Sequence, residues 1–301
     1  MLRHPLAAAC LLLLAACSAR AAAPVAPDPL RDLARLRQVS NPARLEALQA
    51  LLRERGLPFE LQTFPSPATP LGRTTGTNVM LTFGPAEGRE IVLSAHYDAV
   101  EWKQSGTLSQ GMVDNGSGTM ILLDVATALR GRPLRHRIRF LWTDQEEFGL
   151  KGIEAFLASR KPGEIAAVVN VDTAGYGEAA VYGVGKTAAD AQLHQTVATV
   201  CAAQRLECLE FPAFPAGDDR AVQRAAIPVV SIGFLPRIEA HQLWLLFNAK
   251  EGSGLADGWV PPVLKIIHTP EDTLDKVDPR TLGRGTGLVL ETVRRLDAEL
   301  G

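Results

Sequence analysis

Short apolar segments alternate with helical segments along this chain, and this alternation constrains the fold more than any other feature. Glu90–Ala95 and Ile165–Val171 are compact apolar runs, whereas Gly116–Leu129 and Ala188–Gln204 have the spacing of helices. A strand with apolar residues on both faces is buried on both faces, as in sheets that helices cover from two sides. The pattern therefore predicts an α/β sandwich around a mostly buried sheet.

The other predicted elements continue the alternation, and neither an internal repeat nor a linker divides the body of the chain. Helical spacing runs from Arg31 to Arg55 and restarts at Asn41-Pro42, where proline fits the first turn. Further strands are predicted at Phe59–Phe64, Asn78–Phe83, Arg137–Thr143, Ala179–Gly183, Leu206–Phe211 and Pro228–Gly233, and further helices at Leu150–Ser159 and Thr281–Leu300. We expect one large domain with a substantial core.

Composition excludes two classes of protein. Of the 301 residues, 47% are hydrophobic, and 31 Lys+Arg against 33 Asp+Glu leave a formal net charge of -2. A disordered chain would be less apolar and more strongly charged. A nucleic-acid-binding protein would need a basic surface, which a nearly neutral chain is not built to supply. We expect no nucleic-acid partner.

The first residues have the features of an export signal. Arg3 precedes the apolar run Leu6–Ala16, which is shorter than the ~20 residues that a membrane-spanning helix needs. The run continues into Leu-Ala-Ala-Cys, ending at Cys17, which resembles the bacterial lipoprotein box. That resemblance implies a signal peptide over residues 1–16 and a lipid on Cys17 that anchors the protein to a membrane. An ordinary signal peptide, with Cys17 incidental, is the alternative.

The lipoprotein interpretation divides the chain into three parts. After the signal peptide, residues 17–29 are an Ala/Pro-rich, lipid-anchored tether, and residues 30–301 form a single domain. We expect the protein to be exported and held at the bacterial cell envelope, on the outer membrane facing the periplasm. An oxidising compartment permits a disulfide between Cys201 and Cys208, and two separate buried thiols are the alternative.

Five polar motifs follow the predicted strands, where the ligands of open α/β sheets gather. Each motif alone also fits a structural role, such as a capped turn, a strand-end hydrogen bond or a solvated acidic turn. Together, their imidazole and carboxylate groups form a mixed nitrogen and oxygen ligand set that suits zinc-like cations. The motifs are His96-Tyr97-Asp98, Asp114-Asn115-Gly116, Glu146-Glu147, Asn170-Val171-Asp172 and His268-Thr269-Pro270.

Spacing within the motifs indicates further roles. On an extended backbone, positions i and i+2 point the same way, so Asp98 can accept the spare N–H of His96. The adjacent Glu146 and Glu147 point in different directions, so one can bind a metal while the other moves protons. The sequence thus predicts a metal site with a separate carboxylate available as a base.

The motifs, in this order, resemble those of the dizinc aminopeptidases of the aminopeptidase Y and bacterial leucyl aminopeptidase group, which are related to glutaminyl cyclases. The resemblance runs from about residue 75 to the C-terminus, and its most specific parts are Glu146–Gly152 and His268–Thr273. It implies a single domain built as a three-layer α/β/α sandwich with a mixed, mostly parallel central sheet.

The resemblance also implies two Zn2+ ions and their ligands. Asp114 would bridge the ions. His96 and Asp172 would complete the coordination of one ion, and Glu147 and His268 that of the other. Two ions that share a water lower its pKa toward neutrality.

The same resemblance implies the activity. Glu146 would be the general base, and Asp98 would orient His96. Residues 30–301 would then be a zinc-dependent exopeptidase domain, an aminopeptidase that removes N-terminal residues from peptide substrates through a metal-bridged water. We expect a monomer.

Three stretches depart from the family's pattern. Where the family often has Ser-Asp-His-x-x-Phe, residues 216–222 keep the Asp and replace the His. Ile267 stands where some members have the Tyr of an auxiliary oxyanion donor. The stretch 236–263 is long for a connector and fits a lid over the cleft, a short packed helix at Glu239–Asn248, or a membrane-touching surface.

Three other functions stay open from the sequence. A glutaminyl cyclase shares the fold and most motifs, and the Gly-Leu-Lys-Gly run after Glu147 favours the peptidase. A carboxypeptidase for acidic C-terminal residues would need a basic pocket, for which Arg220, Arg224 and Arg237 are candidates. A catalytically silent binding relative would be expected to have lost ligands or the base, and this chain has both.

Overall fold

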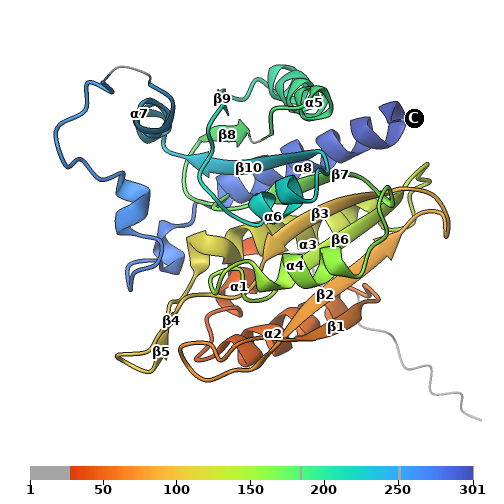
Figure 1. Cartoon of the computed structure of the whole chain (residues 1–301), viewed down its shortest axis with the longest axis horizontal. Coiled ribbons are helices and arrows are strands. Elements are labelled where there is room, and N and C mark those ends of the chain that lie inside the picture. The colour runs from red at the N-terminus through yellow and green to blue at the C-terminus, as the bar shows by residue number, and fades with distance from the viewer. Residues whose placement is uncertain (1–27, 184, 250–251, 301) are drawn as a thin grey trace, which may run out of the picture.

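An eight-stranded mixed sheet forms the centre of the molecule (Figure 1). The computed structural model describes residues 28–183, 185–249 and 252–300, so the predicted signal peptide and Cys17 lie outside the described residues. Across the sheet the strands are β1 (Glu60–Pro65), β2 (Thr75–Phe83), β6 (Arg137–Thr143), β3 (Glu90–His96), β7 (Ile165–Val171), β10 (Val229–Leu235), β8 (Ala179–Gly183) and β9 (Cys208–Phe211).

Strand directions in this sheet are mixed, as expected. β6, β3, β7 and β10 are parallel neighbours. β2 pairs antiparallel with both β1 and β6 at one side of the sheet. At the other side, β8 pairs antiparallel with β10 and parallel with β9. The parallel block therefore lies at the centre, where strand ends of the same polarity meet.

Helices cover both faces of the sheet, and two clusters of buried hydrophobic side chains fill the spaces between. This arrangement confirms the predicted α/β/α fold. One face carries α1 (Pro29–Ala34), α2 (Asn41–Glu54), α3 (Ser117–Leu129), α5 (Ala188–Gln204) and α8 (Pro279–Glu299). The other face carries α4 (Lys151–Ala158), α6 (Asp219–Arg224) and α7 (Arg237–Asn248).

On the face covered by α4, α6 and α7, the central strands change from apolar to polar toward their carboxyl ends. On β3, Val92 belongs to the buried cluster, and Ser94 and His96 follow on the same face because side chains two residues apart point the same way. On β7, Asn170 and Asp172 repeat this order, and Ser94 Oγ donates to Asn170 Oδ1 at 2.9 Å. The core on this face thus leads into a polar row at one edge.

Several short elements were not expected from the sequence. They are the hairpin of β4 (Glu101–Trp102) and β5 (Thr107–Leu108), the π-helical turn η1 (Met112–Gly116), and the 3-10 turns η2 (Pro262–Lys265) and η3 (Leu274–Lys276). Each has too few residues for a periodic pattern, so only its tertiary contacts define it.

A disulfide joins Cys201 on α5 to Cys208 at the start of β9, with the two Cα atoms 6.2 Å apart. The sequence left open whether these cysteines pair or stay separate, because the answer depends on how the chain turns back after α5. Arg205 adopts a left-handed conformation directly after that helix and turns the chain back toward β9. Among the helices of the described part of the chain, none is both long and apolar enough to cross a membrane.

Candidate metal centre

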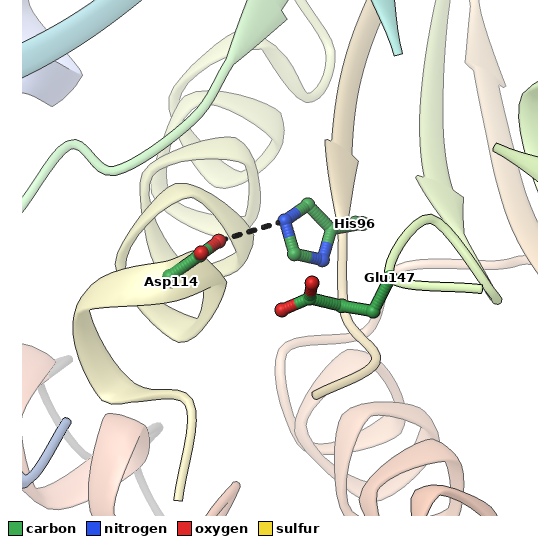
Figure 2. Close-up of side chains that lie close together, drawn as sticks. All are labelled: His96, Asp114 and Glu147. Carbon is green, nitrogen blue, oxygen red and sulfur yellow. Dashed lines mark hydrogen bonds and ion pairs between the residues drawn. The ribbon is translucent and has the colours of Figure 1, made fainter. Parts of the chain in front are cut away.

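The five predicted ligands lie together at the carboxyl end of the parallel strands, although they come from different elements. His96 ends β3, and Asp172 directly follows β7. Glu147 lies in the turn between β6 and α4, Asp114 lies in η1, and His268 lies in the loop after η2. Figure 2 shows the side chains of three of them directed toward one another.

The Asp114 carboxylate lies between the two histidines. Its Oδ1 is 3.0 Å from Nε2 of His96, and its Oδ2 is 3.0 Å from Nε2 of His268. Asp172 Oδ1 is 3.6 Å from the same His96 nitrogen, and Glu147 Oε2 is 3.1 Å from the same His268 nitrogen. The residues thus form two candidate ligand sets that share Asp114, which is the partition that the family resemblance implies.

The spacing of these atoms fits a pair of metal ions. Zinc bonds to imidazole nitrogen and carboxylate oxygen are about 2.0–2.2 Å long, so two ligand atoms of a tetrahedral site lie about 3.3 Å apart. The distances within the two sets run from 3.0 to 3.6 Å and bracket that value. Imidazole and carboxylate groups are also ligands that zinc accepts. The residues present therefore fit one ion in each set.

Asp98 joins His96 to the loop that carries the two glutamates. Its Oδ1 lies 3.5 Å from Nδ1 of His96, and its backbone carbonyl lies 3.2 Å from the same nitrogen. Its carboxylate also accepts the backbone N–H groups of Glu146 (3.1 Å) and Glu147 (3.3 Å). Beside the orienting contact with His96 that the sequence predicts, Asp98 therefore holds the glutamate loop against β3.

Asp272 is a supporting residue whose role the sequence analysis missed. Its buried carboxylate accepts the backbone N–H groups of Met112 (3.0 Å), Val113 (2.6 Å) and Asp114 (3.1 Å). These bonds fix η1, so the Asp114 side chain leaves the backbone at a defined place. The one available signal is that Asp272 belongs to the same motif as His268, so a single loop supplies one ligand and supports another.

Burial and neighbouring acids shift the protonation of the site. Burial disfavours a charged His96, but the carboxylates of Glu146 and Asp114 outweigh it and raise the pKa of His96 well above its ordinary value. Hydrogen bonds to Asp114 and Glu147 raise the pKa of His268 to about 11. Burial raises the pKa of Glu147 to about 7, with the charge of Asp114 adding to the effect. Zinc binding at these residues would therefore release protons.

An apolar pocket of about 210 Å³ opens beside the ligand sets. Asp114, Asp172 and His268 line it together with Glu146. The hydrophobic side chains of its lining, here called the apolar wall, come partly from α7 and η2. This wall consists of Val181, Phe211, Phe214, Leu235, Leu243, Phe247, Val263, Leu264 and Ile267.

The segment 236–263 therefore contributes both a packed helix and a wall of the cleft. Trp244 Nε1 donates to the β9 backbone at 2.9 Å, and Asn248 Oδ1 accepts the backbone N–H of Ala213 at 2.6 Å. The buried Glu239 carboxylate accepts the backbone N–H of Val263 and so ties α7 to η2. These contacts fix the apolar wall relative to the sheet.

The stretch that departs from the family pattern lies at the same pocket. Asp219 lines the pocket, and Asp218 is buried next to it. Burial raises the pKa of each carboxyl to about 7. A Cβ atom on Gly217 would lie 3.0 Å from Asp172 Oδ2 and 3.7 Å from Glu146 Oε1. The glycine thus leaves space next to both carboxylates.

The arginines that would favour a carboxypeptidase lie elsewhere. Arg224 and Arg237 form ion pairs with glutamates that do not line the pocket. Arg220 donates to the backbone carbonyl of Phe214 at 2.6 Å. Among the described residues that line the pocket, none is an arginine or a lysine.

Comparison with known sequences points to one family. The profile of Peptidase family M28 matches residues 78–293. A probable leucine aminopeptidase from Arthroderma otae is 26% identical over 215 residues, which is 66% of this chain and 52% of that protein. This chain spans about half the length of the curated relatives that match most of it.

Solved structures share the fold at low sequence identity. BSAP, a zinc aminopeptidase from Bacillus subtilis, matches with a TM-score of 0.57 at 20% identity, covering 74% of this chain and 50% of that one. A glutaminyl cyclase from Porphyromonas gingivalis matches with a TM-score of 0.64 at 19% identity, covering 89% and 95%. At these identities the likeness shows the fold alone, which the peptidase and the cyclase have in common.

Proposed function

The chain belongs to peptidase family M28, and from this membership we propose that it is a zinc-dependent aminopeptidase that hydrolyses N-terminal residues from peptides. One observation carries the proposal. The Asp114 carboxylate joins two ligand sets beside an apolar pocket that also contains Glu146. This arrangement combines sites for two ions, a base and a place for a substrate side chain.

His96 and Asp172 would hold one zinc ion, Glu147 and His268 would hold the other, and Asp114 would bind both. When bound, the ions would supply Lewis acidity and lower the pKa of a water held between them. The chain itself fixes the ligands, because buried carboxylates hold the backbone N–H groups around them. These bonds would hold Asp114 and Glu147 in place before an ion arrives.

Glu146 is the proposed general base. It lines the pocket next to the ligand sets, and Asp98 holds its backbone N–H. Burial raises the pKa of Glu146 well above its ordinary value, so its carboxylate accepts a proton more readily than an exposed glutamate would. Glu146 would take the proton from the attacking water and deliver it to the leaving amine.

The pocket favours a peptide N-terminus with an apolar first side chain. Its apolar wall encloses about 210 Å³ next to the ligand sets. The carboxylates of Glu146, Asp172 and Asp219 line the same pocket and suit an α-amine. A C-terminal carboxylate would meet these acids without an arginine or a lysine from the described lining residues, which argues against a carboxypeptidase.

Mass spectrometry of a defined peptide mixture, incubated with purified residues 18–301 and zinc, tests the proposal. We expect stepwise loss of N-terminal residues that a chelator abolishes and zinc restores. The control variant Glu146→Gln keeps every proposed ligand and should leave the peptides intact. Loss of ammonia alone from N-terminal glutamine would identify a cyclase instead. Loss from the C-terminus would identify a carboxypeptidase, and a protein that binds no zinc would refute the mechanism.

We also propose that the protein is exported and anchored by a lipid on Cys17 at the outer membrane, facing the periplasm. The apolar run that ends in Leu-Ala-Ala-Cys supports this proposal. Metabolic labelling with a fatty acid, followed by membrane fractionation, tests it. The wild-type chain should carry the label in the membrane fraction, and Cys17→Ser should carry none. Equal labelling of both chains would contradict the anchor.

A further inference from the structure

Arg44 is a fully buried arginine on the apolar face of α2. The exposed fraction of its side chain is 0%, like those of Leu48 and Leu52, which follow at helical spacing on the same face. Burying a guanidinium group costs free energy unless its N–H groups are satisfied. A charge at this position therefore needs an explanation in the structure around it.

The partners of this guanidinium are backbone carbonyl groups. Nε donates to the carbonyl of Tyr97 at 2.7 Å, and Nη2 donates to that of Gly111 at 3.2 Å. Nη1 donates to the carbonyls of Gln110 at 2.5 Å and Leu36 at 2.9 Å. These bonds use most of the donors that an arginine has.

Two of the segments held in this way carry proposed metal ligands. Tyr97 directly follows His96 at the end of β3, and Gly111 directly precedes η1, which contains Asp114. The two ligands are hydrogen-bonded to each other across this junction at 3.0 Å. Arg44 therefore connects the backbones of both partners of that contact.

The charge of Arg44 acts against the binding of a cation. Burial lowers the pKa of Arg44 to about 10, so the side chain stays protonated at neutral pH. The negative charges of Asp98, Asp272 and Glu147 stabilise it from a distance. A positive charge next to the metal centre would, by Coulomb repulsion alone, weaken zinc binding.

We propose that Arg44 is a positioning residue for the metal centre, which clamps the two ligand segments so that His96 and Asp114 face each other before zinc binds. The identity of the ion rests on the proposed function, whereas the clamp rests on the contacts themselves. Removing the side chain removes both its charge and its clamp, and these two losses change the zinc affinity in opposite directions. If the charge dominates, the variant binds zinc more tightly; if the clamp dominates, it binds zinc less tightly.

Zinc dissociation constants, measured by competition with a chromophoric chelator, decide between the two. We expect Arg44→Met and Arg44→Lys each to weaken zinc binding by about 10- to 100-fold, the range for residues that support metal ligands. Lysine keeps the charge but lacks the planar fork that reaches several carbonyls, so it should not rescue binding. Arg53→Met, at an exposed position of the same helix, is the matched control and should bind zinc like the wild type.

Peptide hydrolysis measured against zinc concentration gives a second readout. If Arg44 affects hydrolysis only by supporting zinc binding, Arg44→Lys should recover most of the wild-type rate of hydrolysis at high zinc concentration. Affinity equal to or tighter than that of the wild type in the two Arg44 variants would overturn the proposal. Circular dichroism in the presence of a chelator shows whether each variant folds. If Arg44→Met does not fold, the zinc affinity of Arg44→Lys decides. Failure of both to fold would also overturn it, because Arg44 would then belong to the folding core.

The outcome also separates this inference from the proposed function. A wild-type protein that binds zinc but cleaves no peptide would refute the aminopeptidase and leave the Arg44 comparison valid. A wild-type protein that binds no zinc would overturn both.

Discussion

Replacing Arg73 by methionine tests whether the loop that carries the proposed base depends on a buried ion pair. Arg73 Nη1 lies 2.9 Å from Asp144 Oδ2, and its Nε lies 2.9 Å from Glu101 Oε1. The exposed fraction of the side chain is 17% for Arg73, 2% for Asp144 and 5% for Glu101. The variant therefore leaves two buried carboxylates without their cation, and Asp144 belongs to the same turn as Glu146.

We expect Arg73→Met to lower the free energy of unfolding by about 3 kcal/mol at pH 8, the lower end of the range for removing one partner of a buried pair. Burial and the charge of Asp98 already raise the pKa of Asp144 above its ordinary value of 3.8, although Arg73 opposes them. Without Arg73 this pKa rises further. A carboxyl whose pKa is higher in the folded state destabilises the fold as pH rises through that window, so the loss should be smaller at pH 5.

Urea denaturation in the presence of a chelator, at both pH values, measures this loss without a contribution from zinc. The set of variants is Arg73→Met, Asp144→Asn and the double variant. Because the asparagine removes the stranded charge, adding it to Arg73→Met should restore part of the stability at pH 8. Strictly additive losses, or the same loss at both pH values, would refute the ion-pair explanation.

Three further changes have expected outcomes. Glu146→Gln should lower kcat by about 10²- to 10⁴-fold with zinc content unchanged, because it removes only the base; full activity would exclude that role. Replacing Cys201 and Cys208 by serine opens a short loop and should cost at most about 2.5 kcal/mol, seen calorimetrically as a Tm lower by about 5–10 °C, and an unchanged Tm would count against the disulfide. Gly217→Ala places a methyl group 3.0 Å from Asp172 Oδ2 and should lower kcat/KM about tenfold, with the free energy of unfolding changed by less than about 0.5 kcal/mol; loss of stability instead would point to a packing role.

The layered fold and the cluster of polar strand ends could be predicted because both follow from local patterns. A strand such as Ile165–Val171 is apolar at every position except Asn170, and the polar residue that ends such a run must lie at the edge of the buried sheet. Parallel neighbouring strands bring those ends to one edge of the sheet. Ser94 on β3 pairs with Asn170 on β7, 76 positions later in the chain, and this pairing brings His96 close to Asp172. Predicting that a site exists thus requires the local patterns and the parallel pairing of a few strands, and little else about the tertiary structure.

The supports of the site could not be predicted in the same way, because each depends on which backbone groups arrive from distant segments. Arg44 did carry a signal, since a charged residue at the spacing of Leu48 and Leu52 interrupts the apolar face of a helix. Asp272 carried only its place in the His268 motif, and Arg73 carried nothing that distinguishes it from a surface charge. The sequence did place the stretch 236–263 beside the cleft, but not the side chains that form the apolar wall, because contacts such as that of Glu239 with Val263 bring α7 and η2 together.

The charge of the site explains why so much of the structure holds its ligands. Carboxylates from several segments converge on two imidazoles, and burial strengthens the repulsion among like charges. In the absence of ions, protons on His96 and His268 offset part of that repulsion, and backbone N–H groups and arginines offset more. Two divalent cations would take over the role of those protons. Weakening a support should therefore appear first in zinc affinity, and only second in the stability of the zinc-loaded protein.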